Sequence, residues 1–156
     1  MYKQIDSNKS KTYVLITFFL AVIIGLGWVF ARIYDNPIIL IFAVIFSVVQ
    51  ALVSYFYSDR IALAVSGASK LERKDNVGLF RIVENLSIAA GTPAPKVYLI
   101  GDTAPNAFAT GRDPKHASIA VTQGLLDKLD KTELEGVIAH EMSHIGNYDI
   151  LLSTIV

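Results

Sequence analysis

Two long uncharged stretches near the N-terminus constrain the fold of this chain more than any other feature. Residues 13–31 and 37–58 contain no Asp, Glu, Lys or Arg. As a helix, each stretch is long enough to cross the roughly 30 Å hydrocarbon core of a bilayer. The whole chain is 53% hydrophobic and 18% charged, with a mean hydropathy of +0.46, which is too apolar for an ordinary soluble domain of 156 residues. We therefore predict two membrane-spanning helices.

The connection between the two stretches predicts how the helices are arranged. Residues 32–36 allow a short turn, so the helices should be antiparallel neighbours that form a hairpin. Basic residues flank the outer ends of the hairpin, whereas the turn has Arg32 alone. By the positive-inside rule we expect the N-terminus and the region after residue 58 to lie in the cytoplasm, as parts of a multi-pass membrane protein. The flanking basic residues are Lys3, Lys9, Lys11, Arg60, Lys70, Arg73 and Lys74.

Aromatic residues near the ends of both stretches favour the same topology. Trp28, Tyr34, Tyr55 and Tyr57 occupy positions typical of anchors at the membrane interface. A cleavable signal peptide is the alternative interpretation of the first stretch, since lysines precede it and Ala31 is small. The length of the apolar run, the missing small-x-small pattern and the second span directly after it favour the hairpin.

The sequence His140-Glu141-Met142-Ser143-His144 predicts a zinc site. Histidines four residues apart lie on one side of a helix, so both imidazoles can bind a single Zn²⁺. Glu141 is then placed to accept a proton from a water on the metal, as a general base. Thr132 and Glu135 match a capping box, and apolar residues at helical spacing follow them into the motif. This helical context makes a chance match on a solvated helix the weaker interpretation.

A catalytic zinc ion usually takes three protein ligands, and the third is not evident in this chain. A metzincin would have glycine at position 147 and histidine at position 150, where the chain has Asn147 and Ile150. His116 is the remaining histidine, but a polar turn with Pro114 is more typical of an exposed side chain than of a ligand. The other possibility is a carboxylate from a later helix that lies outside the chain.

The region between the hairpin and the zinc motif predicts a small α+β domain. A helix should begin at Val77 and end at Gly91, because helical periodicity stops there and prolines follow. Residues 96–100 and 117–122 have the composition of strands and are separated by a polar loop. A short helix over residues 125–129 should precede the zinc helix.

The second predicted strand and the loop before it are the candidate substrate-binding elements. An exposed edge of the strand, around Ile119 and Ala120, could pair with an extended substrate backbone. A strand that merely fills the sheet is the alternative. Asn106 and Ala107, in the preceding loop, either line the cleft or satisfy a turn requirement.

We therefore predict an α+β fold, mainly helical, in four segments. They are a cytoplasmic tail (1–12), a transmembrane hairpin (13–58), a domain that carries the zinc motif (59–148) and a short apolar end (149–156). Asp149 opens the last segment, where a helix cap is favoured over a contact that orients a ligand histidine. The formal net charge is zero without a long basic run, so nucleic acid is not an expected partner.

Several motifs in order resemble one family. The stretches Asn106–Gly111, Ile119–Leu126 and Glu133–Val137, together with the zinc motif and the hairpin, are similar to the HtpX heat-shock membrane metalloproteases, relatives of the CAAX-prenyl endoproteases. The resemblance implies a zinc endopeptidase of the inner membrane that acts in stress response and protein quality control. Its active site would face the cytoplasm, and its substrates would be misfolded or damaged membrane proteins.

The resemblance also assigns roles to residues. His140 and His144 match the zinc ligands of the family, and Glu141 matches its general base. The third ligand of the family is a glutamate on a helix beyond a second membrane hairpin, and residues 149–156 resemble the first turns of that hairpin. The resemblance therefore implies that residues 59–148 are the N-terminal part of a zincin-like catalytic domain and that residues 149–156 begin a third apolar span. We expect this chain to be part of a longer zinc endopeptidase. A catalytically silent membrane adaptor that lacks the third ligand is the alternative hypothesis.

Overall fold

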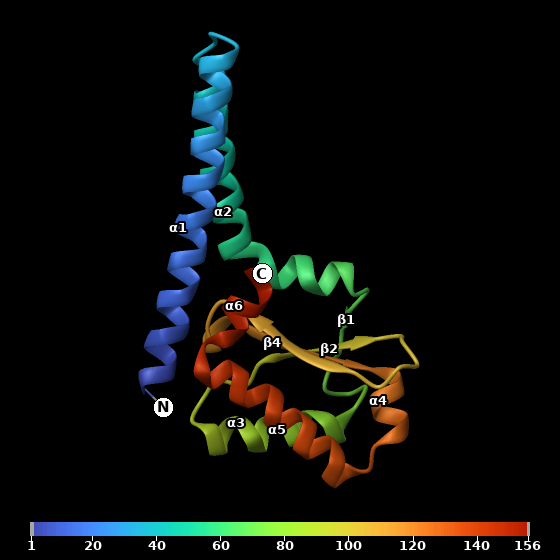
Figure 1. Ribbon diagram of the computed structural model, residues 1–156. Coiled ribbons are helices and arrows are strands. Elements are labelled where there is room, and N and C mark those ends of the chain that lie inside the picture. The colour runs from blue at the N-terminus through green and yellow to red at the C-terminus, as the bar shows by residue number, and fades with distance from the viewer. Residues whose placement is uncertain (1, 156) are drawn as a thin grey trace.

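The protein consists of a long helical hairpin and a small α+β domain at its base (Figure 1). The computed structural model describes the backbone of residues 2–155 and the side chains of residues 5–152. The side chain of Lys3 and those at the end of the predicted third span lie outside these ranges. The predicted fold class, α+β and mainly helical with an N-terminal hairpin, is confirmed.

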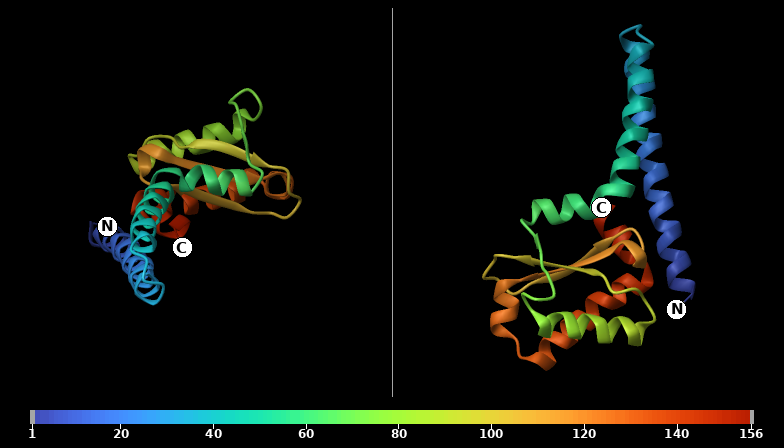
Figure 2. Two further views of the ribbon diagram at one scale, coloured as in Figure 1. Left: turned by 90° about the horizontal axis from the view of Figure 1, so that it is seen from above. Right: turned by 180° about the vertical axis from the view of Figure 1, so that it is seen from behind.

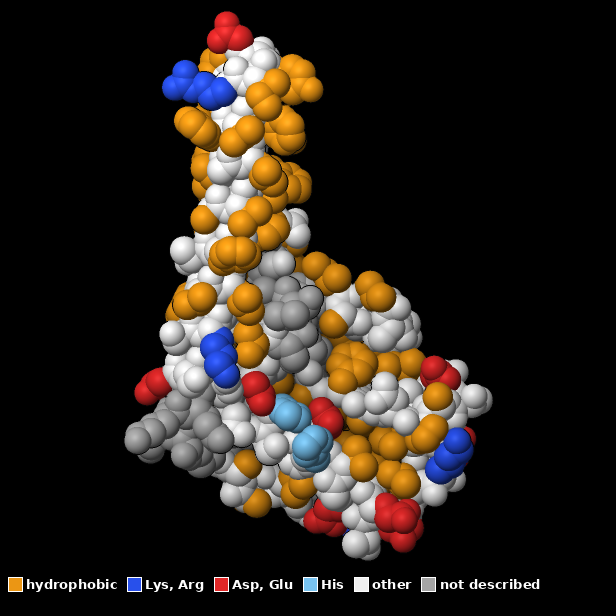
Figure 3. All heavy atoms as spheres, in the orientation of Figure 1, with side chains coloured by type: hydrophobic (Ala, Val, Ile, Leu, Met, Phe, Trp, Pro, Cys, Tyr) orange, Lys and Arg blue, Asp and Glu red, His pale blue; other side chains and the backbone are white. Residues whose placement is uncertain are grey.

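The hairpin is formed by α1 (Tyr2–Ile33) and α2 (Ile38–Val65), which run antiparallel. Both helices are long and apolar enough to cross a membrane. Hydrophobic side chains cover the shaft, and charged ones gather at its tip and base (Figure 3). The helices approach closely at Gly27, where a β-carbon would overlap the side chain of Ala43. Glycine therefore sets the close packing of the upper hairpin.

Both helices extend beyond the predicted spans at the base of the hairpin. The first turns of α1, before residue 13, continue past the membrane stretch and run alongside the domain (Figure 2). The C-terminal part of α2 turns away from the shaft of the hairpin and runs across the domain (Figure 1). The hairpin and the domain are thus in contact through both helices.

The sheet has four strands in the order β1-β2-β4-β3. The strands are β1 (Ser69–Lys70), β2 (Lys96–Ile100), β3 (Ala107–Gly111) and β4 (Ala117–Thr122). β2 and β4 are parallel, whereas β3 and β4 are antiparallel. The short 3-10 helix η1 (Pro114–His116) connects β3 to β4. The sequence had predicted a polar loop in place of β3. This prediction missed the strand because its alanines and glycine have low β-propensity.

The position of β4 contradicts the predicted substrate-binding edge. β4 lies between β2 and β3, and all of its residues are buried. Ile119 and Ala120 are fully buried and have no surface on which a substrate could bind. The edge strands of the sheet are β1 and β3, and β3 is the edge strand next to β4. The prediction was wrong because β3 was not recognised as a strand, and its pairing converts β4 from an edge strand into a central one.

Two helices cover one face of the sheet, α3 (Val77–Ala90) and α5 (Lys131–Asn147), and α4 (Gln123–Lys128) joins β4 to α5 (Figures 1 and 2). α3 begins and ends where the sequence predicted, with the Asn76 side chain accepting a hydrogen bond from Leu79 N and Gly91 in a left-handed conformation. Buried aliphatic side chains from these helices and the sheet form the core. They include Leu79, Val83, Val97, Ile119, Val121, Ile138 and Ile145.

The capping box of α5 lies two residues before the predicted one. Asp130 accepts hydrogen bonds from the backbone N–H groups of Thr132 and Glu133, and the Glu133 carboxylate accepts one from Asp130 N. The assignment to Thr132 and Glu135 was therefore wrong. Both pairs fit the same sequence pattern, and the extended conformation of Asp130 decides between them. The motif helix itself is confirmed.

Gly124 provides a test of the packing between α4 and the loop after β2. A β-carbon at Gly124 would overlap the backbone of Thr103, and Gly124 N donates to Asp102 O at 2.9 Å. We expect Gly124→Ala to lower the free energy of unfolding by roughly 1–3 kcal/mol because backbone must move. Thermal unfolding in detergent would measure it. Gly136→Ala, in α5 with open space around it, is the control and should be neutral or stabilising by up to about 1 kcal/mol. Equal effects at both positions would contradict the close approach.

Candidate metal centre

The predicted zinc motif lies on α5 beside the free edge of the sheet. Glu141 and His144 face a cleft of about 590 Å³ between α5, β3 and α6 (Asp149–Ile155). Histidine side chains meet at one place on the surface, flanked by carboxylates (Figure 3). The residues that line the cleft are Ala107, Phe108, Ala109, Glu141, His144, Asp149, Ile150 and Leu152.

The two histidines of the motif point toward a common position. His140 Nε2 and His144 Nε2 lie 3.3 Å apart, and the rings stand nearly perpendicular with an interplanar angle of 86°. Zn–N bonds of about 2.05 Å in a tetrahedral site would separate two ligand nitrogens by about 3.3 Å. The observed separation of the two Nε2 atoms therefore fits a shared zinc ion.

His144 is oriented by a carboxylate from the next helix. Asp149 Oδ2 lies 2.8 Å from His144 Nδ1. Tyr148, in a left-handed conformation with φ 59°, ends α5 and turns the chain so that Asp149 reaches back to the histidine. A proton held on Nδ1 by this carboxylate leaves the lone pair of Nε2 free for a metal.

This contact overturns the favoured prediction for Asp149, a helix cap. The Oδ1 atom of the same carboxylate is buried and has no hydrogen-bond partner among the described residues, so no capping bond is formed there. Sequence reasoning could not decide between the two roles, because the turn at Tyr148 is not marked by a glycine. The alternative role, orientation of a ligand histidine, is the one that the geometry supports.

Glu141 is held against the free edge of the sheet. The backbone N–H of Ala109, in β3, donates a hydrogen bond to Glu141 Oε2 at 3.0 Å. This N–H points away from β4, to which β3 is paired on its other side. The contact places the carboxylate between the histidines and the edge strand.

The candidate substrate-binding residues before β4 have different positions. Ala107 lines the cleft. Asn106 joins the ends of two strands, since its N–H donates to Thr122 Oγ1 at 2.9 Å and its carbonyl accepts from Thr122 N at 3.0 Å. Asn106 therefore meets a turn requirement. Sequence reasoning missed Phe108 and Ala109 as cleft residues because it did not recognise β3.

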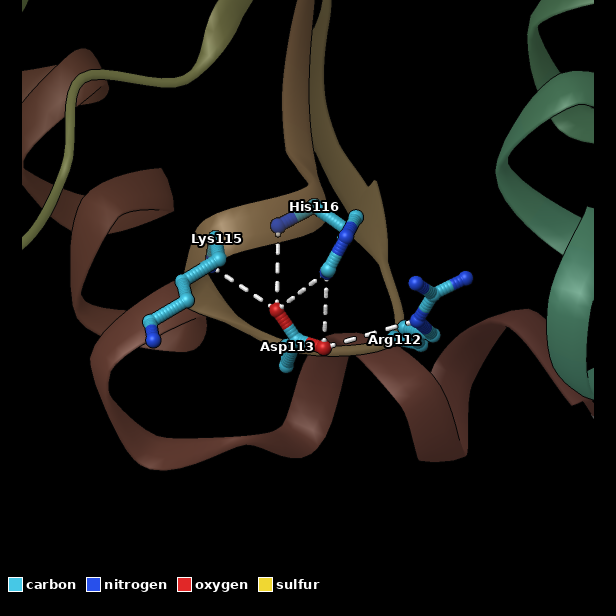
Figure 4. A network of polar contacts seen from close by, with 4 residues as sticks. All are labelled: Arg112, Asp113, Lys115 and His116. Carbon is cyan, nitrogen blue, oxygen red and sulfur yellow. Dashed lines mark hydrogen bonds and ion pairs between the residues drawn. The ribbon is translucent and has the colours of Figure 1, made fainter.

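His116 is not brought to the metal centre. Its Nδ1 lies 2.8 Å from Asp113 Oδ1, beside η1, and its side chain is half exposed. Figure 4 shows the Asp113 carboxylate between His116 and Arg112, whose Nε is 3.5 Å from Asp113 Oδ2. The prediction that His116 is an exposed turn residue and not a ligand agrees with this position.

The surroundings of Asp113 lower its pKa. Burial by itself would raise the pKa, but the hydrogen bond and the charge of His116, together with the N–H groups of Lys115 and His116, outweigh it. The folded protein therefore holds this carboxylate ionised more strongly than the unfolded chain does. The resulting stabilisation is present above the ordinary pKa of 3.8 and is lost as the pH falls through the lowered value.

Asp113→Asn keeps the cap but removes the charge. At pH 6 we expect the variant to be less stable than the unmodified protein by up to about 1 kcal/mol, the range for a partly exposed ion pair. The difference should shrink as the pH falls below about 4, because the native carboxyl is then protonated as well. Unfolding in detergent between pH 6 and pH 3 would measure it. A difference that stays constant over this range would contradict the assignment.

No group of three His, Cys, Asp or Glu side chains that could hold a metal occurs among the residues that the structure describes. The described site offers two imidazoles, a candidate base and a carboxylate that orients one imidazole. The described residues thus supply two candidate metal ligands, His140 and His144.

Comparisons with known proteins identify the family. Residues 73–156 match Peptidase family M48. The chain belongs to this family. It is 50% identical over 156 residues to the Protease HtpX homolog of Tropheryma whipplei (strain Twist), and the match covers 100% of this chain and 53% of the relative. It is 46% identical over 157 residues to the Protease HtpX homolog of Caldanaerobacter subterraneus subsp. tengcongensis, with 100% of this chain and 52% of the relative covered.

The HtpX-type resemblance predicted from the sequence is confirmed, and the chain spans about half the length of these relatives. The crystal structure of S. mikatae Ste24p resembles this structure with a TM-score of 0.54 and 22% identity, covering 99% of this chain and 38% of that one. At this identity the likeness shows a shared fold. The two apolar helices and the M48 relatives together indicate a membrane protein.

Proposed function

We propose that this chain supplies the membrane anchor and the zinc-binding helix of a zinc endopeptidase. The geometry that carries the proposal is the pair of Nε2 atoms, 3.3 Å apart, on a helix that also holds Glu141 against an edge strand. His140 and His144 would hold the zinc ion. The third ligand would be a glutamate from the part of the relatives that this chain does not span. When bound, zinc supplies Lewis acidity to the attacking water and to the scissile carbonyl.

The residues of the chain have separate roles in the proposed reaction. Glu141 accepts a proton at its carboxylate from the attacking water and then donates it to the leaving amine. The Ala109 N–H, 3.0 Å from Oε2, keeps the carboxylate at the cleft side of α5. Asp149 holds a proton on His144 Nδ1 and so keeps Nε2 available for the metal.

The free edge of β3 supports the proposal that the substrates are polypeptides. An extended chain can pair with an exposed strand through its backbone, so that many sequences are accepted. Ala107, Phe108 and Ala109 lie on β3 and line the cleft next to Glu141. Substrate-backbone pairing, which the sequence had placed at β4, is thus proposed for β3. We propose unfolded or damaged membrane polypeptides as substrates, with the cleft on the cytoplasmic side, as the basic residues around the hairpin favour.

Glu141→Gln tests the proposed chemistry. In the full-length protein, we expect this change to lower the cleavage of an unfolded casein-type substrate at least a hundredfold, because the proton acceptor is lost. Bound zinc, measured by elemental analysis, should stay stoichiometric because both imidazoles remain.

Glu135→Gln is the matched control, since Glu135 is exposed on the same helix and outside the cleft. It should leave both cleavage and zinc content unchanged. Full activity in Glu141→Gln would refute the base assignment. A full-length protein that neither binds zinc nor cleaves would favour the silent adaptor.

Asp149→Asn tests the positioning of His144. An amide still fits the space but can present its NH₂ group to Nδ1, which favours the wrong imidazole tautomer. We expect the affinity for zinc, measured by competition with a chelator, to fall 10- to 100-fold. Asp127→Asn, an exposed carboxylate on α4 that contacts Gln123, is the control and should keep the native affinity. Unchanged affinity in Asp149→Asn would show that the contact with His144 has no role in metal binding.

A further inference from the structure

A small cationic pocket lies at the base of the hairpin, and none of its lining residues lines the cleft of the candidate metal centre. It has a volume of about 260 Å³ and lies between α1, α2, the turn after β3 and the corner between α5 and α6. Its polar and aromatic lining includes Lys9, Tyr13, Tyr55, Arg112, Asp113 and Tyr148. We propose that this pocket binds the phosphate headgroup of an anionic phospholipid.

The charges in the pocket favour an anion. Lys9 Nζ lies over the ring of Tyr148, 4.4 Å from its centroid, and the Arg112 guanidinium lies 5.3 Å from the centroid of the Phe56 ring. These aromatic contacts position both cations without neutralising them. The one carboxylate of the lining, Asp113, already accepts hydrogen bonds from the backbone N–H groups of Lys115 and His116.

Arg112 is oriented for a ligand beyond Asp113. It approaches Asp113 through Nε, at 3.5 Å. Figure 4 shows its two terminal nitrogens turned away from that carboxylate, toward the ribbon of α2. These nitrogens are the pair that binds phosphate oxygens in a bidentate manner. The tyrosine hydroxyl groups of the lining can add hydrogen bonds to the same oxygens.

The location of the pocket favours a lipid over phosphate from solution. Tyr13 opens the first apolar stretch and Tyr55 lies near the end of the second, so both helices enter the bilayer at the level of the pocket. Val14 and Phe56, which are 63% and 47% exposed, continue the surface toward the membrane with apolar side chains. A ligand with a phosphate head and acyl chains matches both the cationic pocket and the apolar surface beside it. Basic pockets between transmembrane helices are typical sites for such headgroups.

The pocket also touches the corner that orients the metal ligand. Tyr148, which lines it, directly precedes Asp149, and Asn8 of α1 donates a hydrogen bond to Asn147 O at 3.1 Å. A bound headgroup would therefore brace α1 against the end of α5. The binding itself does not rest on the proposed peptidase function, because none of the pocket residues belongs to the cleft.

Native mass spectrometry of the full-length protein in detergent tests the proposal, with phosphatidylglycerol and phosphatidylcholine offered in equal amounts. We expect preferential retention of phosphatidylglycerol. Lys9→Gln and Arg112→Gln should each weaken this retention about fivefold, and both together about 25-fold. The matched control is Lys11→Gln with Arg60→Gln. Lys11 is exposed on the same helix, and Arg60 lies over the Tyr57 ring at 5.4 Å, but neither lines the pocket.

Three results would overturn the proposal. Equal retention in the pocket variants and the control variants would remove the site, and equal binding of both lipids would remove the preference for an anion. If millimolar glycerol 3-phosphate displaced the lipid, to an extent that follows the charge of glycerol 3-phosphate, the pocket would be assigned to phosphate from solution. Circular dichroism monitors folding, and Lys9→Gln alone decides the outcome if Arg112→Gln does not fold, because Lys9 is exposed.

Discussion

The close approach of α5 to the free edge of β3 is the constraint on which the rest of the site depends. The hydrogen bond from Ala109 N to Glu141 joins the motif helix to the strand, and β3 is itself fixed by its antiparallel pairing with β4. Burial of Ile138 and Ile145 in the core fixes the rotation of α5, so that His140, Glu141 and His144 face away from the core. One packing arrangement therefore positions the imidazoles, the carboxylate and the strand edge together.

The corner at Tyr148 links this site to the hairpin. Its left-handed conformation ends α5 and sends α6 toward α1 and α2, while Asp149 returns to His144. On the opposite side of the same corner, Lys9 and Asn8 of α1 contact Tyr148 and Asn147. The first helix of the hairpin, α1, thus contacts the end of the motif helix directly.

The arrangement of charge differs between the shaft of the hairpin and the domain at its base. The shaft of the hairpin is apolar, as is typical of helices that cross a bilayer, and charges return at its base, where Lys9, Arg112 and Asp113 line one pocket together with tyrosines. Asp113 is stabilised there by backbone N–H groups and His116, so its charge is retained although it is partly buried. The domain therefore begins with polar contacts at the level where the hairpin leaves its apolar stretch.

The sequence by itself determined the hairpin, the helix from Val77 and the motif helix, because apolar periodicity and helix caps are local signals. It also determined that His140, Glu141 and His144 share a helix face, since their spacing matches the helical period. Only the tertiary structure decided that β4 is central, that Asp149 contacts His144 and that Glu141 meets Ala109. Each of these depends on pairing between segments distant along the chain or on a left-handed turn without glycine, and neither leaves a local pattern in the sequence.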